Sequence, residues 1–307
     1  MVNEVGGIIA AASRAAAYPL QQTGSIPAVK RIVLTFQQAG IFPIVVVTGV
    51  EADEVRYQLS DFGVIFVHND DCVAPELFDS FKLGLSYLGR KCRRVVLTPV
   101  NVPMFLPRTL ISLLACDAEI VTPICDGQDG HPVVLSHAIV DAIFQYEGAR
   151  GLRSAIEHFE TRRKKIETTD QGTIHTVHDA LEMAAFLERH NADLLHPFLR
   201  ISIEKDVAFF NARAKLLLLL IDETNSVRSA SEQMALSYSK AWEILNKLES
   251  ELGYPVVDRR HGGSRGGKTS LTERGAAFLK AYQTFEENLF RYAREQFDVL
   301  FREGGTV

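Results

Sequence analysis

Two kinds of apolar segment alternate along the first 123 residues. Short runs rich in isoleucine and valine have the length of buried strands, and the segments between them carry apolar residues at three- and four-residue spacing, which is typical of helices. Strands are expected at residues 7–11, 43–48, 64–67, 94–98 and 120–122, and helices at 27–39, 51–59, 74–88 and 107–115. This alternation predicts an α/β doubly wound, mostly parallel sheet with helices on both faces.

Ligands of such sheets bind beyond the carboxyl ends of the strands. The loops after Ala11, Thr48 and Thr98 are therefore the candidates for a site. Asp70, Asp71 and Cys72 also follow a strand, but three polar residues in a loop are commonplace.

The alternation stops at about residues 184–200, where we expect a domain junction. The chain is thereby divided into residues 1–195 and 200–307. The second part is predicted to be mainly helical, with helices at 214–223, 227–235 and 239–251, strands at 256–260 and 268–271, and a long helix from about 272 to 302.

The third of these helices combines an apolar face with a polar one. Residues at three- and four-residue spacing should face the core: Ala241, Ile244, Leu245, Leu248 and Leu252. Small polar and basic residues are left outside, namely Ser239, Lys240, Glu243, Asn246 and Lys247. Two helices joined by a tight turn, with such groups at the start of the second, indicate a helix-turn-helix. A three-helix packing unit without a ligand is the alternative.

A basic glycine-rich segment follows. Four glycines between residues 262 and 267 separate the two predicted strands, and Arg259, Arg260, Arg265 and Lys268 flank or occupy the tip. Glycine lets the backbone approach a surface closely, and guanidinium groups suit phosphates or a narrow groove. By itself the segment could also be a flexible hairpin with solvated charges.

Composition and charge narrow the class of protein. The chain has 307 residues, 47% hydrophobic and 23% charged, which excludes large-scale disorder. The net charge of −5 arises in the first 200 residues (18 basic, 23 acidic), because residues 201–307 hold 15 of each. The longest apolar run, residues 216–221, is too short to cross a membrane. Cys72, Cys92, Cys116 and Cys125 form no C-x-x-C pair, as expected of free thiols in the cytoplasm.

The C-terminal part resembles the winged-helix domain of molybdate-responsive transcription regulators, which are related to LysR-type regulators. The resemblance lies in residues 221–227 (IDETNSV), 236–245 (LSYSKAWEIL) and 259–275 (RRHGGSRGGKTSLTERG). It implies a recognition helix that starts near Ser237, a wing at residues 262–267 and dimeric binding to a two-fold symmetric site in double-stranded DNA. The tandem molybdate-binding domains of those regulators do not follow here, so molybdate is not expected as the direct signal.

A seven-residue repeat favours dimerisation. Phe278, Phe285, Tyr292 and Val299 recur at this period within the long helix, with Tyr282 and Leu289 between them. Such a period favours lengthwise packing against another helix. The partner could be the chain's own core. We favour a second subunit, because a DNA-binding protein of this kind usually binds two half-sites as a dimer.

Residues 7–185 resemble the nucleotidyltransferase domain that attaches cytidylate or guanylate to the molybdenum cofactor. The matching segments are residues 7–12 (GIIAAA), 19–20 (PL), 44–49 (IVVVTG), 97–103 (LTPVNVP), 130–133 (GHPV) and 151–153 (GLR). The resemblance implies a nucleotide pocket, which here would be formed by Ala12, Ser13, Arg14, Tyr18, Asn101, Gly130 and His131.

Several residues on which the transfer chemistry depends differ from the family pattern. Ala12 replaces the glycine that ends the first strand, Tyr18 replaces the phosphate-binding lysine, and Asn101 replaces the aspartate that holds Mg²⁺. A neutral amide contributes no charge to a metal site. Thr176 and His178 stand where acidic residues are expected. We therefore expect a non-catalytic domain with no cofactor.

A different metal site is conceivable here, because His175 and His178 are three residues apart and Asp179 is adjacent. In an extended segment, however, positions three apart point to opposite faces, and no third ligand is identifiable. Loop histidines without a metal are the preferred interpretation.

The sequence thus predicts a cytoplasmic, homodimeric, DNA-binding transcription regulator without a membrane segment. Its DNA-binding residues are expected to be Ser237, Tyr238, Ser239, Lys240, Lys247, Arg259, Arg260, Arg265 and Lys268. Its degenerate transferase domain would bind a nucleotide or pterin effector. The alternatives are an active Mg²⁺-dependent molybdenum cofactor nucleotidyltransferase that uses CTP or GTP, with an accessory DNA-binding domain, and a protein-interaction module that does not contact DNA.

Overall fold

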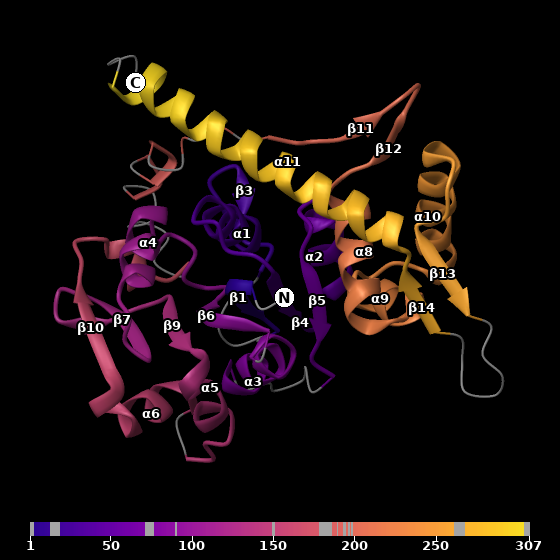
Figure 1. Cartoon of the computed structure of the whole chain (residues 1–307). Helices are drawn as coiled ribbons and strands as arrows, with labels where there is room; N and C mark the ends of the chain where they lie inside the picture. The colour runs from indigo at the N-terminus through magenta and orange to yellow at the C-terminus, as the bar shows by residue number, and fades with distance from the viewer. Residues whose placement is uncertain are drawn as a thin grey trace. The chain divides into compact units, whose positions relative to one another are not determined.

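A computed structural model gives the fold in two compact units, residues 1–59 with 64–195 and residues 60–63 with 196–307 (Figure 1). The structure describes residues 3–12, 19–70, 77–89, 91–148, 151–177, 186–188, 190–192, 195, 197, 199–260 and 268–303. Among these residues, no helix is both long enough and apolar enough to span a bilayer.

The first unit contains an eight-stranded sheet in the order β10-β7-β9-β6-β1-β4-β5, with β8 paired to β7. Its strands are β1 Asn3–Ala11, β4 Ile44–Thr48, β5 Ile65–His68, β6 Cys92–Pro99, β7 Ile120–Cys125, β8 Gln128–Asp129, β9 Val133–Ser136 and β10 Arg163–Glu167. The pairs β1–β4, β1–β6, β4–β5 and β7–β10 are parallel, whereas β9 runs antiparallel between β6 and β7. The predicted mostly parallel α/β fold is thus confirmed. A small hairpin, β2 Gln22–Thr23 with β3 Ile26–Pro27, lies outside this sheet.

The helices of this unit form two groups on opposite faces of the sheet (Figure 1). One group contains α1 Ala28–Gln38, α2 Ala52–Leu59 and α4 Pro107–Ala115, and the other contains α3 Leu77–Leu88, α5 His137–Phe144 and α6 Gly151–His158. A β-carbon on Gly84 of α3 would lie 2.4 Å from Cγ2 of Ile8 on β1. The absence of a side chain at Gly84 therefore allows α3 to pack closely against the central strand.

The strand order reverses direction at β1. From β1 the chain proceeds to β4 and β5 on one side, whereas β6 pairs with the opposite edge of β1. The loops after β1 and β6 therefore leave the sheet in different directions. Ligand sites of open α/β sheets lie in the crevice that such a switch point creates.

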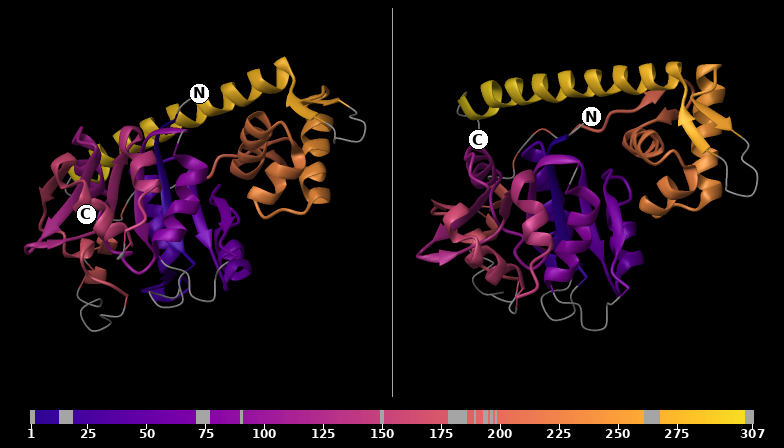
Figure 2. Two further views of the ribbon diagram at one scale, coloured as in Figure 1. Left: turned by 90° about the horizontal axis from the view of Figure 1, so that it is seen from below. Right: turned by 60° about the horizontal axis from the view of Figure 1, so that its bottom comes forward.

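The second unit is mainly helical, with α8 Ala212–Thr224, α9 Val227–Gln233, α10 Tyr238–Leu252 and the long α11 Glu273–Phe297, which continues into a π-helical turn, η3 Asp298–Glu303. Between α10 and α11 lies an antiparallel hairpin, β13 Val257–Arg260 with β14 Lys268–Leu271 (Figure 2). A short antiparallel pair, β11 Ile203–Glu204 with β12 Ala208–Phe210, precedes α8.

Side-chain caps determine where these helices begin. Asn211, Ser226, Ser237 and Thr272 each accept a hydrogen bond from a backbone N–H in the first turn of the helix that follows. Such caps satisfy N–H groups that have no partner within the helix. The start of α10 is thus encoded at Ser237, near the position expected from the sequence.

Candidate nucleic-acid interface and ligand pocket

The first turn of α10 presents small polar and basic groups to solvent. Ser237, Ser239 and Lys240 are exposed, and the Tyr238 side chain is 45% exposed. The opposite face of the helix is anchored because Ala241, Leu245 and Leu248 are buried. Lys240 Nζ lies 2.7 Å from Glu243 Oε1, an exposed pair that contributes little to stability.

Both strands of the β13–β14 hairpin are hydrogen-bonded to the helices of the unit: Val257 of β13 to Glu249, and Thr269 of β14 to Asn225. In β14, the Thr269 N–H donates to the Asn225 carbonyl over 2.9 Å, and Lys268 is exposed. The backbone of Arg260 pairs with that of Lys268. The Arg260 side chain, Arg265 and the predicted tip at residues 262–267 lie outside the described residues.

Three of the predicted cationic groups already have protein partners: Lys240, which pairs with Glu243, and also Arg259 and Lys247. The Arg259 guanidinium donates to Glu249 Oε2 over 2.9 Å and to Asn246 Oδ1 over 3.0 Å, and it lies 4.5 Å from the centre of the Trp242 ring. Lys247 Nζ donates to the Ala208 carbonyl over 2.8 Å. The structure therefore places Arg259 and Lys247 against their own unit.

Sequence reasoning missed three residues of this surface. The Arg228 guanidinium on α9 lies 5.1 Å from the centre of the Tyr238 ring, and that ring meets Trp242 edge-to-face at 6.1 Å. Glu249 bonds the hairpin from α10. The pattern of apolar positions carries no signal for the contacts of Arg228 and Glu249, because each joins two different elements.

The apolar face of α11 divides into two parts. Phe278 and Tyr282 pack edge-to-face on Phe210 of the same unit, with ring centres 4.9 and 4.7 Å apart. Farther along, Phe285 and Tyr292 of α11 and Val299 of η3 are 50%, 62% and 53% exposed. The seven-residue repeat thus serves the intramolecular core in its first part and leaves three large apolar side chains exposed in its second.

In the first unit, the ends of β1, β4 and β6 meet at the switch point. Ala12 is buried, and a β-carbon on Gly49 would lie 2.7 Å from the Ala12 carbonyl oxygen. The Asn101 carbonyl accepts a hydrogen bond from Val177 N–H over 2.9 Å, while its side-chain Oδ1 is buried without a hydrogen-bond partner among the described residues. Ser13, Arg14 and Tyr18 lie outside the described part of the chain.

Gly130 and His131 lie against the segment around residue 173. The His131 N–H donates to the Thr173 carbonyl over 2.8 Å, and a β-carbon on Gly130 would lie 2.7 Å from that same oxygen. His131 Nδ1 is buried and has no hydrogen-bond partner among the described residues. Burial lowers the pKa of the His131 imidazole to about 4, so the ring is neutral near pH 7.

The described residues do not fit a magnesium site. They contain no group of three or more histidine, cysteine, aspartate or glutamate side chains arranged to hold a metal. At the switch point Asn101 offers only a neutral oxygen. Of the alternative metal set, the His175 ring lies tilted against Phe186 with ring centres 4.8 Å apart, and His178 and Asp179 lie outside the described residues.

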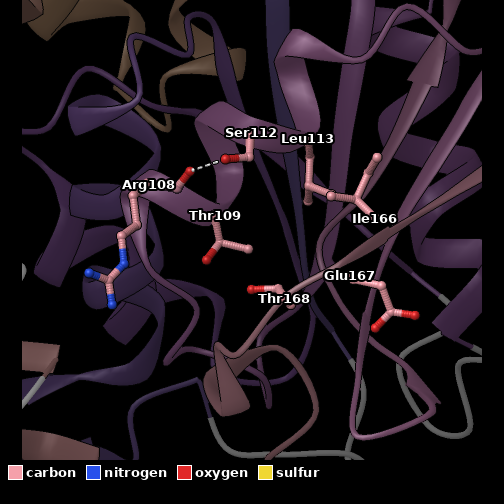
Figure 3. A pocket seen from close by; sticks show the side chains of 7 residues that line it. All are labelled: Arg108, Thr109, Ser112, Leu113, Ile166, Glu167 and Thr168. Atoms are coloured by element: carbon pink, nitrogen blue, oxygen red, sulfur yellow. Dashed lines mark hydrogen bonds between the residues drawn. The ribbon is translucent and has the colours of Figure 1, made fainter.

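A cavity of about 170 Å³ lies elsewhere, between α4 and the end of β10 (Figure 3). It is lined by Arg108, Thr109, Ser112, Leu113, Ile166, Glu167 and Thr168. Of the residues predicted for the nucleotide pocket, the four that the structure describes (Ala12, Asn101, Gly130 and His131) do not line it. Its volume is below the usual range for small-molecule sites, so we assign it no role.

Buried Arg31 holds the end of the first unit in place. Its guanidinium donates to Thr23 Oγ1, to Asn191 Oδ1 and, over 3.1 Å, to His190 Nδ1. His190 Nε2 lies 3.2 Å from the Phe105 carbonyl. His190 is therefore neutral, with its proton on Nε2, since Nδ1 must accept from Arg31. Burial and the neighbouring Arg31 charge lower the pKa of His190 to about 4.

We expect acid to destabilise this unit through His190. The folded state releases the proton at about pH 4 and the unfolded chain at about pH 6.5, so folding loses stability as the pH falls between these values. The loss at pH 5 is about 2 kcal/mol. Denaturation of the full chain at pH 7 and pH 5 measures it. His190→Gln should remove that part of the pH dependence, and an unaltered dependence would contradict the assignment.

Comparison with known proteins agrees with both units. Residues 16–166 match the MobA-like NTP transferase domain, and residues 215–276 match the bacterial regulatory helix-turn-helix protein of the lysR family. The chain therefore combines a MobA-like NTP transferase domain at the N-terminus with a LysR-type helix-turn-helix at the C-terminus.

Two curated relatives have molybdenum-related names. The chain is 33% identical over 86 residues to the molybdenum-pterin-binding protein MopB of Rhodobacter capsulatus, covering 28% of this chain and 32% of MopB. It is 31% identical over 88 residues to the molybdenum transport protein ModE of Azotobacter vinelandii, covering 28% and 33%. The chain thus spans about a third of the length of each relative.

Solved structures share the transferase fold. Rv0371c of Mycobacterium tuberculosis superposes with a TM-score of 0.51 at 18% identity, covering 60% of this chain and 100% of that one. Its homologue from Mycobacterium sp. strain JC1 gives 0.50 at 19% identity, covering 62% and 99%. At these identities the likeness concerns the fold alone.

Proposed function

We propose that this chain is a DNA-binding transcription regulator. The observation that carries the proposal is the exposed, Ser237-capped first turn of α10, beside a hairpin with basic residues. In this proposal α9 and α10 form a helix-turn-helix, α10 is the recognition helix, and residues 257–271 form the wing. Ser237, Tyr238, Ser239 and Lys240 contact base edges or nearby phosphates in the major groove.

Basic residues supply the sequence-independent part of the affinity. Arg260, Arg265 and Lys268 are assigned to phosphates, as is Lys247, whose bond to the neutral Ala208 carbonyl leaves its charge uncompensated. Arg265→Ala should weaken DNA binding with little change in sequence preference and lower the slope of log affinity against log salt by about one. Titrations at several salt concentrations measure both quantities. Equal affinity and slope in the variant would count against a wing contact with DNA.

The functional unit is a homodimer formed through the exposed part of α11 and the turn η3 that continues it. Phe285, Tyr292 and Val299 follow one another at seven-residue spacing and are at least half exposed. Exposed large apolar residues at this period are typical of a helix that packs along a second helix. Two copies would present two recognition helices to a two-fold symmetric operator.

The N-terminal unit serves as a sensor domain without catalysis. Two buried polar atoms at its candidate pocket, Asn101 Oδ1 and His131 Nδ1, have no hydrogen-bond partner among the described residues, and a ligand with donor groups would satisfy both. A nucleotide or pterin fits this description. The names of the relatives favour molybdenum cofactor or molybdoenzyme metabolism as the regulated process. Calorimetry with CTP, GTP, molybdopterin precursors and molybdate tests the sensor, and no binding by any of them would exclude it.

An active nucleotidyltransferase is the second candidate, favoured by the match of residues 16–166 to an NTP transferase domain. The amide at position 101 argues against it, because metal-assisted transfer needs charge to stabilise the leaving pyrophosphate. Incubation with labelled CTP or GTP, Mg²⁺ and molybdopterin distinguishes the two functions. Pyrophosphate release would establish the enzyme.

A gel shift on the DNA upstream of the chain's own gene tests DNA binding. We expect a retarded complex with the full-length protein that resists an excess of unrelated DNA. If no complex forms, or if an excess of unrelated DNA abolishes it, the result would favour the alternative, a protein-interaction module that does not bind specific DNA.

A further inference from the structure

Glu249 holds the first strand of the wing to the recognition helix with both of its carboxylate oxygens. Oε1 accepts hydrogen bonds from the backbone N–H groups of Val256 and Val257, over 2.8 and 3.1 Å. Oε2 accepts from Arg259 Nη2 over 2.9 Å. The Glu249 side chain is only 16% exposed, so these bonds are largely shielded from water. One side chain thus bonds three donors within four consecutive residues of the chain.

Arg259 returns along the exposed side of α10 and contacts it over two turns. Trp242, Asn246 and Glu249 are spaced by four and three residues, so they lie on one face of the helix. The guanidinium lies 4.5 Å from the centre of the Trp242 ring and donates to Asn246 Oδ1 over 3.0 Å in addition to Glu249. A planar guanidinium can stack on an aromatic ring and donate to a carboxylate at the same time, whereas lysine lacks this geometry.

We propose that Arg259 is a positioning residue, which together with Glu249 and Trp242 forms a brace that fixes the wing against the recognition helix. This inference rests on the proposed function, in which wing and helix contact the same DNA. The Arg259 charge is already compensated by Glu249, so a phosphate would have to compete with that bond. The sequence alone predicts a phosphate contact for Arg259.

The brace reduces the free-energy cost of binding. A hairpin that is loose in the free protein has to be ordered when DNA binds, and that ordering opposes affinity. A wing that is already ordered against the helix in the free protein does not incur this free-energy cost when DNA binds. The brace therefore predicts an effect on affinity without an effect on the number of phosphates neutralised.

Fluorescence tests the brace without DNA, because Trp242 is the only tryptophan in the chain. Arg259→Met and Glu249→Gln should each change the intensity or the emission maximum of Trp242, since both release the guanidinium from the ring. Lys268→Ala, an exposed charge on the opposite wing strand, is the matched control and should leave the emission unchanged. Emission identical to the wild type in both brace variants would overturn the proposal.

Salt titration separates positioning from phosphate contact. With a duplex selected by the full-length protein from a random pool, Arg259→Met should bind about tenfold more weakly, with an unchanged salt slope. Lys268→Ala should lower the slope by about one. Arg259→Lys should not restore affinity, because lysine retains the charge but has no planar guanidinium that can stack on Trp242 and donate to Glu249 at the same time. If Arg259→Met lowers the salt slope by one, or if Arg259→Lys binds DNA as tightly as the wild type, Arg259 contacts a phosphate and is not a positioning residue.

The two experiments fail independently. If the wild-type protein selects no duplex, the proposed function fails, while the fluorescence of Trp242 still decides whether the brace exists. If the wild type binds and Arg259→Met behaves like the wild type in both experiments, only the brace is wrong.

Discussion

Tyr292→Glu in α11 is expected to convert the protein from a dimer to a monomer and to lower its affinity for a two-half-site operator at least about hundredfold. In the proposed dimer Tyr292 lies in the middle of the exposed series between Phe285 and Val299. A two-fold interface buries each such side chain twice, and burying a large apolar side chain stabilises by about 1.5–3 kcal/mol. A glutamate there would also be desolvated without a partner.

Sedimentation of the variant measures this effect, and gel shifts with the same DNA measure its consequence. Glu287→Lys is the matched control, because Glu287 is exposed and lies on the other side of the helix from Tyr292. It should remain a dimer. A Tyr292→Glu protein that sediments as the wild type does would show that α11 is not the dimer interface.

Asp170→Ala is expected to destabilise the N-terminal unit by about 3–5 kcal/mol. Asp170 is 8% exposed, and its carboxylate accepts hydrogen bonds from Leu106 N–H and Thr109 Oγ1, each over 2.7 Å, and from Gly172 N–H over 3.1 Å. It therefore joins the start of α4 to the 171–173 turn. Removing it leaves buried donors without an acceptor, which is costlier than losing one hydrogen bond.

Chemical denaturation of the full-length chain, followed by circular dichroism, measures the loss in the transition of this unit. Asp53→Ala provides the control. Asp53 is exposed and pairs across one helical turn with Arg56, so its removal should cost less than about 0.5 kcal/mol. A loss below 1 kcal/mol in Asp170→Ala would contradict the structural role.

Much of the fold could be predicted because local patterns specify it. The helix at residues 107–115 was predicted with its observed bounds, since Pro107 suits a first helical position and the apolar period is clear. The runs that became β4 and β6 are rich in valine and fully buried at their centres. In contrast, β10 has the sequence RKKIE at the edge of the sheet, where no apolar alternation identifies a strand.

The candidate sites were predictable only where they coincide with an element's own pattern. The exposed face of α10 follows from the spacing of its buried residues. The Glu249–Arg259 bond joins different elements, and the partners of Asp170 lie 61 and 64 residues earlier in the chain. Contacts of this kind depend on tertiary packing, which single-sequence patterns do not report.

Footprinting of the full-length protein on its selected DNA tests the central claim most directly. A dimeric DNA-binding protein with one recognition helix per subunit should protect two half-sites that are related by a two-fold axis. The centres of the half-sites should lie about one turn of the DNA helix, or a multiple of it, apart. Lys240→Ala should weaken both protected regions together. A single protected segment, or protection that is equal on unrelated sequences, would contradict a dimeric, sequence-specific regulator.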